Sequence, residues 1–211
     1  MHKIIFISTI HKEIGKCNSD ELCKIIEILK PEVIFLEAVE ETYSAYEDYL
    51  FSTYGVYHKK LELSAIQKYN YNHSFEYVPV CENSLSEAFH QKNSIVCKNR
   101  DLQKLIENSI SLTETYGFNF LNSLESMNLQ EEMRMLESQI LSGSNLDRIV
   151  KEDIDAYENP MIQNIYSYCK NHQFKTAIFM CGAAHRKSII EKIEKFNIQE
   201  EITLSWTVYE S

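Results

Sequence analysis

Two histidines follow apolar segments at opposite ends of the chain, each after a few small, hydroxyl or aliphatic residues. The run 176–179 leads into MCGAAH, which ends at His185, and the run 3–7 leads into Ser-Thr-Ile-His, which ends at His11. Imidazole binds metal ions and transfers protons near neutral pH. For one isolated histidine, a polar residue in the first turn of a helix is the simpler interpretation. The same pattern used twice favours a functional site.

Three glutamates could complete such a site. Glu37 and Glu82 each come shortly after a short apolar segment, and Glu13 lies two residues past His11. A carboxylate adds negative charge to a metal site and can carry protons. Each glutamate could instead be solvated at a strand end, in a turn or in a loop, and this alternative stays open.

Two imidazoles with one or two carboxylates form a ligand set suited to Mn, Fe, Co or Zn. Such an ion lowers the pKa of a bound water to about 7 and polarises a carbonyl or phosphoryl oxygen. We therefore expect a divalent metal held by His11, Glu37 and His185, with Glu82 or Glu13 as an additional ligand or proton carrier. No local H-E-x-x-H motif fixes this geometry, so the prediction depends on the fold.

Other candidate sites are weaker. A pair of Cys181 with His185 is conceivable, but the position of this thiol at the end of an apolar run favours burial. The eight tyrosines between positions 43 and 77 could line an aromatic pocket, although packing is the simpler interpretation. The sequence contains no G-x-S-x-G elbow and no glycine-rich phosphate loop.

The elements that position these residues begin with a strand–helix–strand unit. Segments 3–8 and 33–36 each contain four consecutive apolar residues, which predicts strands buried on both faces. Between them, residues 18–30 combine N-cap residues with apolar residues at helical spacing, and Pro31 ends the helix. Such a unit predicts parallel strands joined by a right-handed crossover.

The remaining chain has a long helical middle and a second strand–helix–strand pattern. The predicted helices cover 39–52, 60–70, much of 84–141, 146–171 (where Pro160 could introduce a kink) and about 186–196. The predicted strands cover 76–80, 175–180 and 202–208.

These elements predict one α/β domain over residues 1–211, with a mainly parallel central sheet flanked by helices and a helical insertion over about 84–171. In such sheets, ligands bind beyond the carboxyl ends of the strands. The segments that end near His11, Glu37, Glu82 and His185 should bring these side chains to that edge.

Composition excludes some functions. The formal net charge of −10 argues against a nucleic-acid binder that depends on phosphate contacts. No window approaches the roughly 18 apolar residues of a membrane span. Six cysteines without C-x-x-C spacing, and no recognisable secretory leader, predict reduced thiols and a cytoplasmic location.

The motifs resemble those of the TraB/TIKI group, within the wider set that includes erythromycin-esterase-like and ChaN-like proteins. That group carries two G-x-x-H motifs and a glutamate that closes the second strand of the opening unit. GAAH, ending at His185, matches the second motif, and the segment ending at His11 matches the first except that Ser8 replaces glycine. The segment that ends in Glu37 resembles the one that delivers the glutamate. The resemblance covers the two ends of the chain and not its middle.

The resemblance implies a metal-dependent hydrolase that acts on a peptide or a small molecule. TIKI-like members are metalloproteases, and other relatives act on small esters or bind haem. The family's helix before the last motif usually carries an arginine where this sequence has Glu158, so Arg148 or Arg186 would have to substitute. The competing interpretation is a non-catalytic protein that binds a ligand in the same cleft.

Overall fold

The computed structural model describes residues 2–39, 58–84 and 86–210, and in these ranges the chain forms a five-stranded sheet. The strand order is β3-β2-β4-β1-β5, and every neighbouring pair is parallel. The strands are β1 (Lys3–Thr9), β2 (Val33–Val39), β3 (Glu76–Cys81), β4 (Thr176–Gly182) and β5 (Ser205–Val208). The predicted α/β fold with a parallel central sheet is confirmed.

Helices occupy most of the segments in which we expected them. They are α1 (Ser19–Leu29), α3 (Leu61–Asn70), α4 (Glu87–Val96), α5 (Arg100–Tyr116), α6 (Phe118–Leu121), α7 (Leu124–Ile140), α8 (Leu146–Asn171) and α9 (Arg186–Gln199), with a short 3-10 turn over Ala183–His185 before α9. The helix expected over 39–52 lies almost entirely outside the described residues.

The helical segment 84–141 is divided into four helices by local capping. The side chains of Asn99 and Ser123 accept hydrogen bonds from backbone N–H groups in the first turns of α5 and α7. Gly117 separates α5 from α6 with a φ of +60°, a conformation that favours glycine. These residues end one helix and begin the next, which hydrophobic spacing alone did not resolve.

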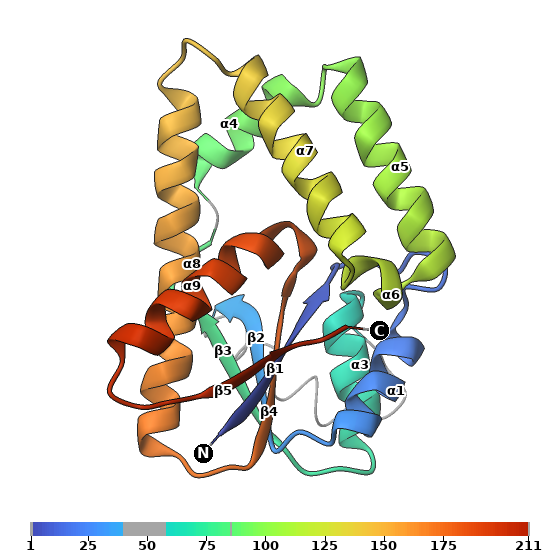
Figure 1. Cartoon of the computed structure of the whole chain (residues 1–211). Coiled ribbons are helices and arrows are strands. Elements are labelled where there is room, and N and C mark those ends of the chain that lie inside the picture. Colours follow the sequence, from blue (N-terminus) through green and yellow to red (C-terminus); the bar gives the residue numbers. More distant parts are fainter. Residues whose placement is uncertain (1, 40–57, 85, 211) are drawn as a thin grey trace.

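The two faces of the sheet are covered by different helices (Figure 1). Alternate residues of the central strands point to opposite sides, so Ile5 and Ile178 pack with α1 and α3, whereas Phe6 and Phe179 pack with α8 and α9. Both sets are almost completely buried. This coverage explains why the strands read as continuous apolar runs.

The insertion helices α4, α5, α6 and α7 stand beyond the carboxyl ends of the strands, and α8 returns along the sheet (Figure 1). The core beneath α1 and α3 continues into the insertion through Phe118, Phe120 and Leu129. The insertion is therefore packed onto the sheet edge at which we expected a site.

The described helices include none that is both long and apolar enough to cross a bilayer. The structure contains all six cysteines as free thiols; five of them are buried and Cys97 is exposed.

Candidate functional site

A pocket of about 310 Å³ lies at the carboxyl edge of β1, β2 and β4. It is lined by Glu37, by His185 and its preceding turn, and by His11 with its neighbours Thr9 and Ile10. The shared sheet edge thus brings three predicted site residues to one pocket.

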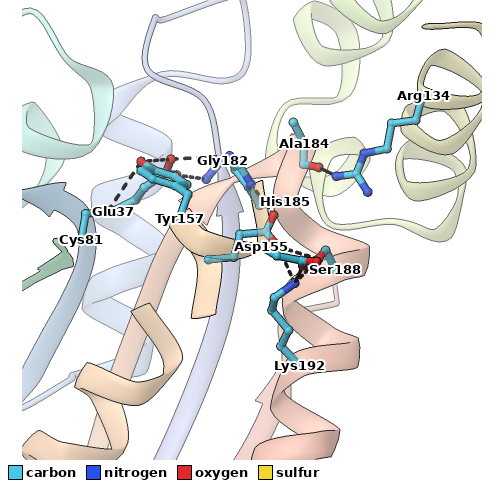
Figure 2. A network of polar contacts seen from close by, with 11 residues as sticks. Glu37, Cys81, Arg134, Asp155, Tyr157, Gly182, Ala184, His185, Ser188 and Lys192 are labelled. Atoms are coloured by element: carbon cyan, nitrogen blue, oxygen red, sulfur yellow. Dashed lines mark hydrogen bonds and ion pairs between the residues drawn. The ribbon is translucent and has the colours of Figure 1, made fainter. Parts of the chain in front are cut away.

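The insertion closes another part of this pocket. Ser109, Ile110 and Thr113 of α5 and Gln130 of α7 also line it. Arg134 of α7 donates a hydrogen bond to the carbonyl of Ala184, in the turn that carries His185 (Figure 2). The helical middle of the chain therefore forms part of the site.

Glu37 and His185 face each other across the edge of the sheet. Glu37 Oε1 lies 3.6 Å from His185 Nε2, and the two side chains are 7% and 13% exposed. The N–H of Gly182 donates to Glu37 Oε2 at 2.6 Å, and the hydroxyl of Tyr157 donates to Oε1 at 2.9 Å (Figure 2). A Cβ at Gly182 would lie 3.3 Å from Glu37 Oε2, so glycine permits this close approach.

The environment of Glu37 favours its ionised form. Burial alone would raise the pKa of this carboxyl, but the charge of His185 and the hydrogen bond from Gly182 outweigh it, and the pKa lies below its ordinary value. Glu37 therefore presents an ionised carboxylate in a fixed orientation, and its oxygens could act as ligands of a metal ion.

A second carboxylate, that of Glu158, contacts His185 through the ring nitrogen that does not face Glu37. His185 Nδ1 lies 2.6 Å from Glu158 Oε1, and Glu158 is completely buried. Ser188 Oγ donates to Glu158 Oε2 at 2.5 Å, and Lys192 Nζ lies 3.0 Å from the same oxygen. Burial would raise the pKa of Glu158, but the hydrogen bond from His185, with support from Ser188 and Lys192, lowers it overall.

His11 has a similar arrangement with Glu62 of α3. His11 Nδ1 lies 3.0 Å from Glu62 Oε1, which also accepts a hydrogen bond from the Thr9 hydroxyl at 2.8 Å. The hydrogen bond with Glu62 raises the pKa of His11 against the opposing effect of burial. Glu62 Oε2 is buried without a partner among the described residues.

Both histidines therefore use Nδ1 to contact a buried glutamate, which leaves Nε2 available for a ligand. Metal-binding histidines are commonly oriented in this way, through the nitrogen that does not bind the ion. Glu62 and Glu158 were missed as site residues because both lie on helices rather than after strands. One sequence signal pointed to this part of the site. His185, Ser188 and Lys192 are three and then four residues apart, which places them on one face of a helix that begins at the site.

The complete metal-ligand set is not assembled in the structure. Across residues 2–39, 58–84 and 86–210, no three His, Cys, Asp or Glu side chains come close enough together to hold one ion. Glu37 and His185 form a close pair, whereas His11 lines the same pocket without joining them. Two of the three expected ligands are thus brought together.

The two additional glutamates lie elsewhere. Glu13 Oε1 accepts hydrogen bonds from the N–H and the hydroxyl of Ser19 at the start of α1. Glu82 lines a different cavity, with Cys81 and Asn164. Neither lines the pocket of Glu37, so we assign them no role in it.

The two arginines considered as substitutes are also engaged elsewhere. Arg148 pairs with Glu152 on the exposed surface of α8 at 2.7 Å. Arg186 is buried and donates to Ser8 Oγ and to Asn122 Oδ1, both at 3.0 Å. Ser8, which stands where the related motif has glycine, is therefore part of a structural hydrogen-bond network.

The remaining sequence hypotheses concern thiols and tyrosines. Cys181 is buried, and burial raises the pKa of its thiol well above the ordinary value, so the thiol is not a reactive partner for His185. Tyr69 and Tyr77 belong to the hydrophobic core, in agreement with packing. The tyrosines at 43, 46, 49, 54 and 57 lie outside the described residues.

Comparisons of this chain with protein-family models, with curated proteins and with solved structures find no match. The resemblance to the TraB/TIKI group therefore depends on the sequence motifs alone, namely the two histidine motifs, the segment that ends in Glu37 and residues 157–161.

Proposed function

We propose that this chain is a metal-dependent hydrolase of the TraB/TIKI type, with its reaction centre in the pocket of Glu37 and His185. The observation that carries the proposal is the pairing of these two side chains. They lie 3.6 Å apart; Glu37 accepts a hydrogen bond from the half-buried Tyr157, and His185 contacts the buried Glu158.

The separation of the pair fits two ligands of one ion. Ligand atoms lie about 2.0–2.2 Å from a zinc-like ion, which separates two tetrahedral ligands by about 3.4 Å. Catalytic sites of this kind use three protein ligands. The candidate for the third ligand is Nε2 of His11, because this side chain lines the same pocket and its Nδ1 contacts Glu62. His11 would have to move closer to Glu37 and His185 to complete the set, since no three such side chains of the described residues lie close enough to hold one ion.

When bound there, a divalent ion would polarise a substrate carbonyl and lower the pKa of a water molecule. The chain's own residues orient the reactants. Tyr157 and Gly182 hold the carboxylate of Glu37, and Glu158 holds the imidazole of His185. The helices α5 and α7 contribute part of the lining of the pocket.

The lining of the pocket indicates the class of substrate. Ile10, Ile14, Ile110 and Leu121 contribute aliphatic surface, and Gln130 contributes a polar group. The described lining includes no lysine or arginine, which phosphorylated substrates would need. An uncharged ester or amide with an aliphatic group matches this lining best.

Elemental analysis and hydrolysis assays test the proposal. Protein purified without added metal should contain about one equivalent of Mn, Fe, Co or Zn. A chelator should abolish hydrolysis of uncharged acyl esters or short peptides, and the metal should restore it. Glu37→Gln and His185→Ala should reduce activity by about 100-fold or more, whereas Glu82→Gln should leave it unchanged. Full activity in the metal-free protein would contradict the proposal.

The aliphatic lining also supports a second candidate, a non-catalytic protein that holds a small apolar ligand in the same pocket. In that case ligand binding would survive both Glu37→Gln and His185→Ala, and it would be lost in Ile110→Asp.

A further inference from the structure

The contacts of Glu158 fix its protonation state and its role. Glu158 Oε2 lies 3.0 Å from Lys192 Nζ and accepts a hydrogen bond from Ser188, while Oε1 lies 2.6 Å from His185 Nδ1. A carboxylate that contacts an ammonium group and a hydroxyl donor is ionised and can only accept hydrogen bonds. Nδ1 of His185 must therefore carry the proton in their shared hydrogen bond.

This hydrogen bond determines which nitrogen of His185 reacts. In a neutral imidazole, a proton on Nδ1 leaves the lone pair on Nε2. That nitrogen lies 3.6 Å from Glu37 Oε1, itself an acceptor in the ionised form. Two acceptors that face each other at this distance are stabilised by a cation or a proton between them.

The supporting residues belong to one helix face. His185 precedes α9, and Ser188 and Lys192 follow it by three and then four residues, so all three lie along the side of α9 that faces Glu158. Glu158 comes from α8, and α8 and α9 pack on the same face of the sheet. The glutamate is thus held by a packed helix pair rather than by a mobile surface loop.

We propose that Glu158 is a positioning residue that holds His185 in the Nδ1–H tautomer, so that Nε2 presents its lone pair to the pocket. The TraB/TIKI group, which the sequence motifs resemble, usually carries arginine at the position of Glu158. The inference rests on the proposed function only for its consequence, which is stronger metal binding.

Nitrogen-detected NMR of the histidine side chains in metal-free protein tests the inference directly. At a pH at which His185 is neutral, the wild type should show a protonated Nδ1 and an unprotonated Nε2. In Glu158→Gln the amide can either accept or donate a hydrogen bond, so both tautomers should appear. Mn²⁺ affinity in calorimetry should then fall by about 10–100-fold.

Asp155→Asn is the matched control. Asp155 also contacts Lys192, at 2.5 Å, but it has no contact with His185 among its hydrogen bonds and ion pairs in the described structure. This variant should keep the wild-type tautomer and Mn²⁺ affinity. A wild-type protein with Nε2 protonated would overturn the inference even if Glu158→Gln fails to fold. So would a Glu158→Gln protein that keeps both the wild-type tautomer and the wild-type affinity. A wild type that shows the Nδ1–H tautomer but binds no Mn²⁺ would support the positioning role while contradicting the proposed metal function.

Discussion

Tyr157 and Glu158 are consecutive residues of α8, and they hold the two opposing side chains of the site. The Tyr157 hydroxyl donates to Glu37, and Glu158 accepts from His185. Neighbouring positions on a helix point about 100° apart, so one turn of α8 can contact both Glu37 on β2 and His185 in the turn after β4. The geometry of the pair therefore depends on how α8 packs against the sheet.

Removing the Tyr157 hydroxyl should lower both stability and metal affinity, while the aromatic ring keeps its packing. Tyr157→Phe deletes the hydrogen bond to an ionised carboxylate, which should lower the free energy of unfolding by about 1–3 kcal/mol in urea titrations. The affinity for Mn²⁺ should also fall, because Glu37 loses an orienting donor. Tyr116→Phe, at an exposed position on α5, is the control and should change neither quantity. An unchanged Mn²⁺ affinity in Tyr157→Phe would show that this donor does not orient Glu37.

Arg186 should prove to be structural. Its guanidinium is buried and donates to Ser8, to Asn122 and to the carbonyl of Tyr209. Lysine cannot reproduce this set of donors, so Arg186→Lys should lower the free energy of unfolding by roughly 3 kcal/mol. At temperatures at which the variant is folded, its Mn²⁺ affinity should match the wild type. A selective loss of activity with unchanged stability would instead place Arg186 in the reaction.

Stability should fall in acid because of the site carboxylates. The pKa values of Glu37 and Glu158 are below their ordinary value in the folded chain, although burial alone would raise them, because His185 and hydrogen-bond donors favour the anions. Their contribution is thus complete above the unfolded pKa of about 4.3 and is lost as the pH falls through the folded pKa. Denaturant titrations between about pH 3 and 6 should show this decrease, with a shallower slope in Glu158→Gln. Equal slopes in both proteins would contradict the lowered pKa of Glu158.

One thiol should react much faster than the other five. Burial raises the pKa of Cys17, Cys81 and Cys169 to about 12, whereas Cys97 is exposed. Iodoacetamide at mildly alkaline pH should therefore label Cys97 first in the native protein, and all six cysteines after denaturation without reductant. Mass spectrometry that finds disulfides in fresh protein, or early labelling of buried thiols, would contradict this expectation.

The strands and the common position of three site residues could be predicted because parallel strands leave a simple signal. Strands that are buried on both faces of the sheet appear in the sequence as apolar runs. The residues that follow parallel strands must lie at the same carboxyl edge of the sheet. The structure extends β2 to Val39, so Glu37 lies within the strand rather than after it. The final strand is shorter than expected and begins at Ser205.

The partners of the histidines could not be predicted, because they come from helices distant in the sequence. Glu62 is 51 residues from His11, and Glu158 is 27 residues from His185. A buried glutamate on a helix has the same local sequence pattern as an exposed one. Only the packing of α3 and α8 against the sheet distinguishes them.

Metal-dependent thermal unfolding tests the central claim most directly. Mn²⁺ at about 100 times its dissociation constant should stabilise the wild type by about 2.7 kcal/mol, which raises the midpoint by roughly 5–10 °C. Glu37→Gln and His185→Ala should lose this shift, and Glu82→Gln should keep it. A wild-type midpoint that does not respond to Mn²⁺, Co²⁺ or Zn²⁺, or an equal shift in His185→Ala, would contradict a metal site at Glu37 and His185.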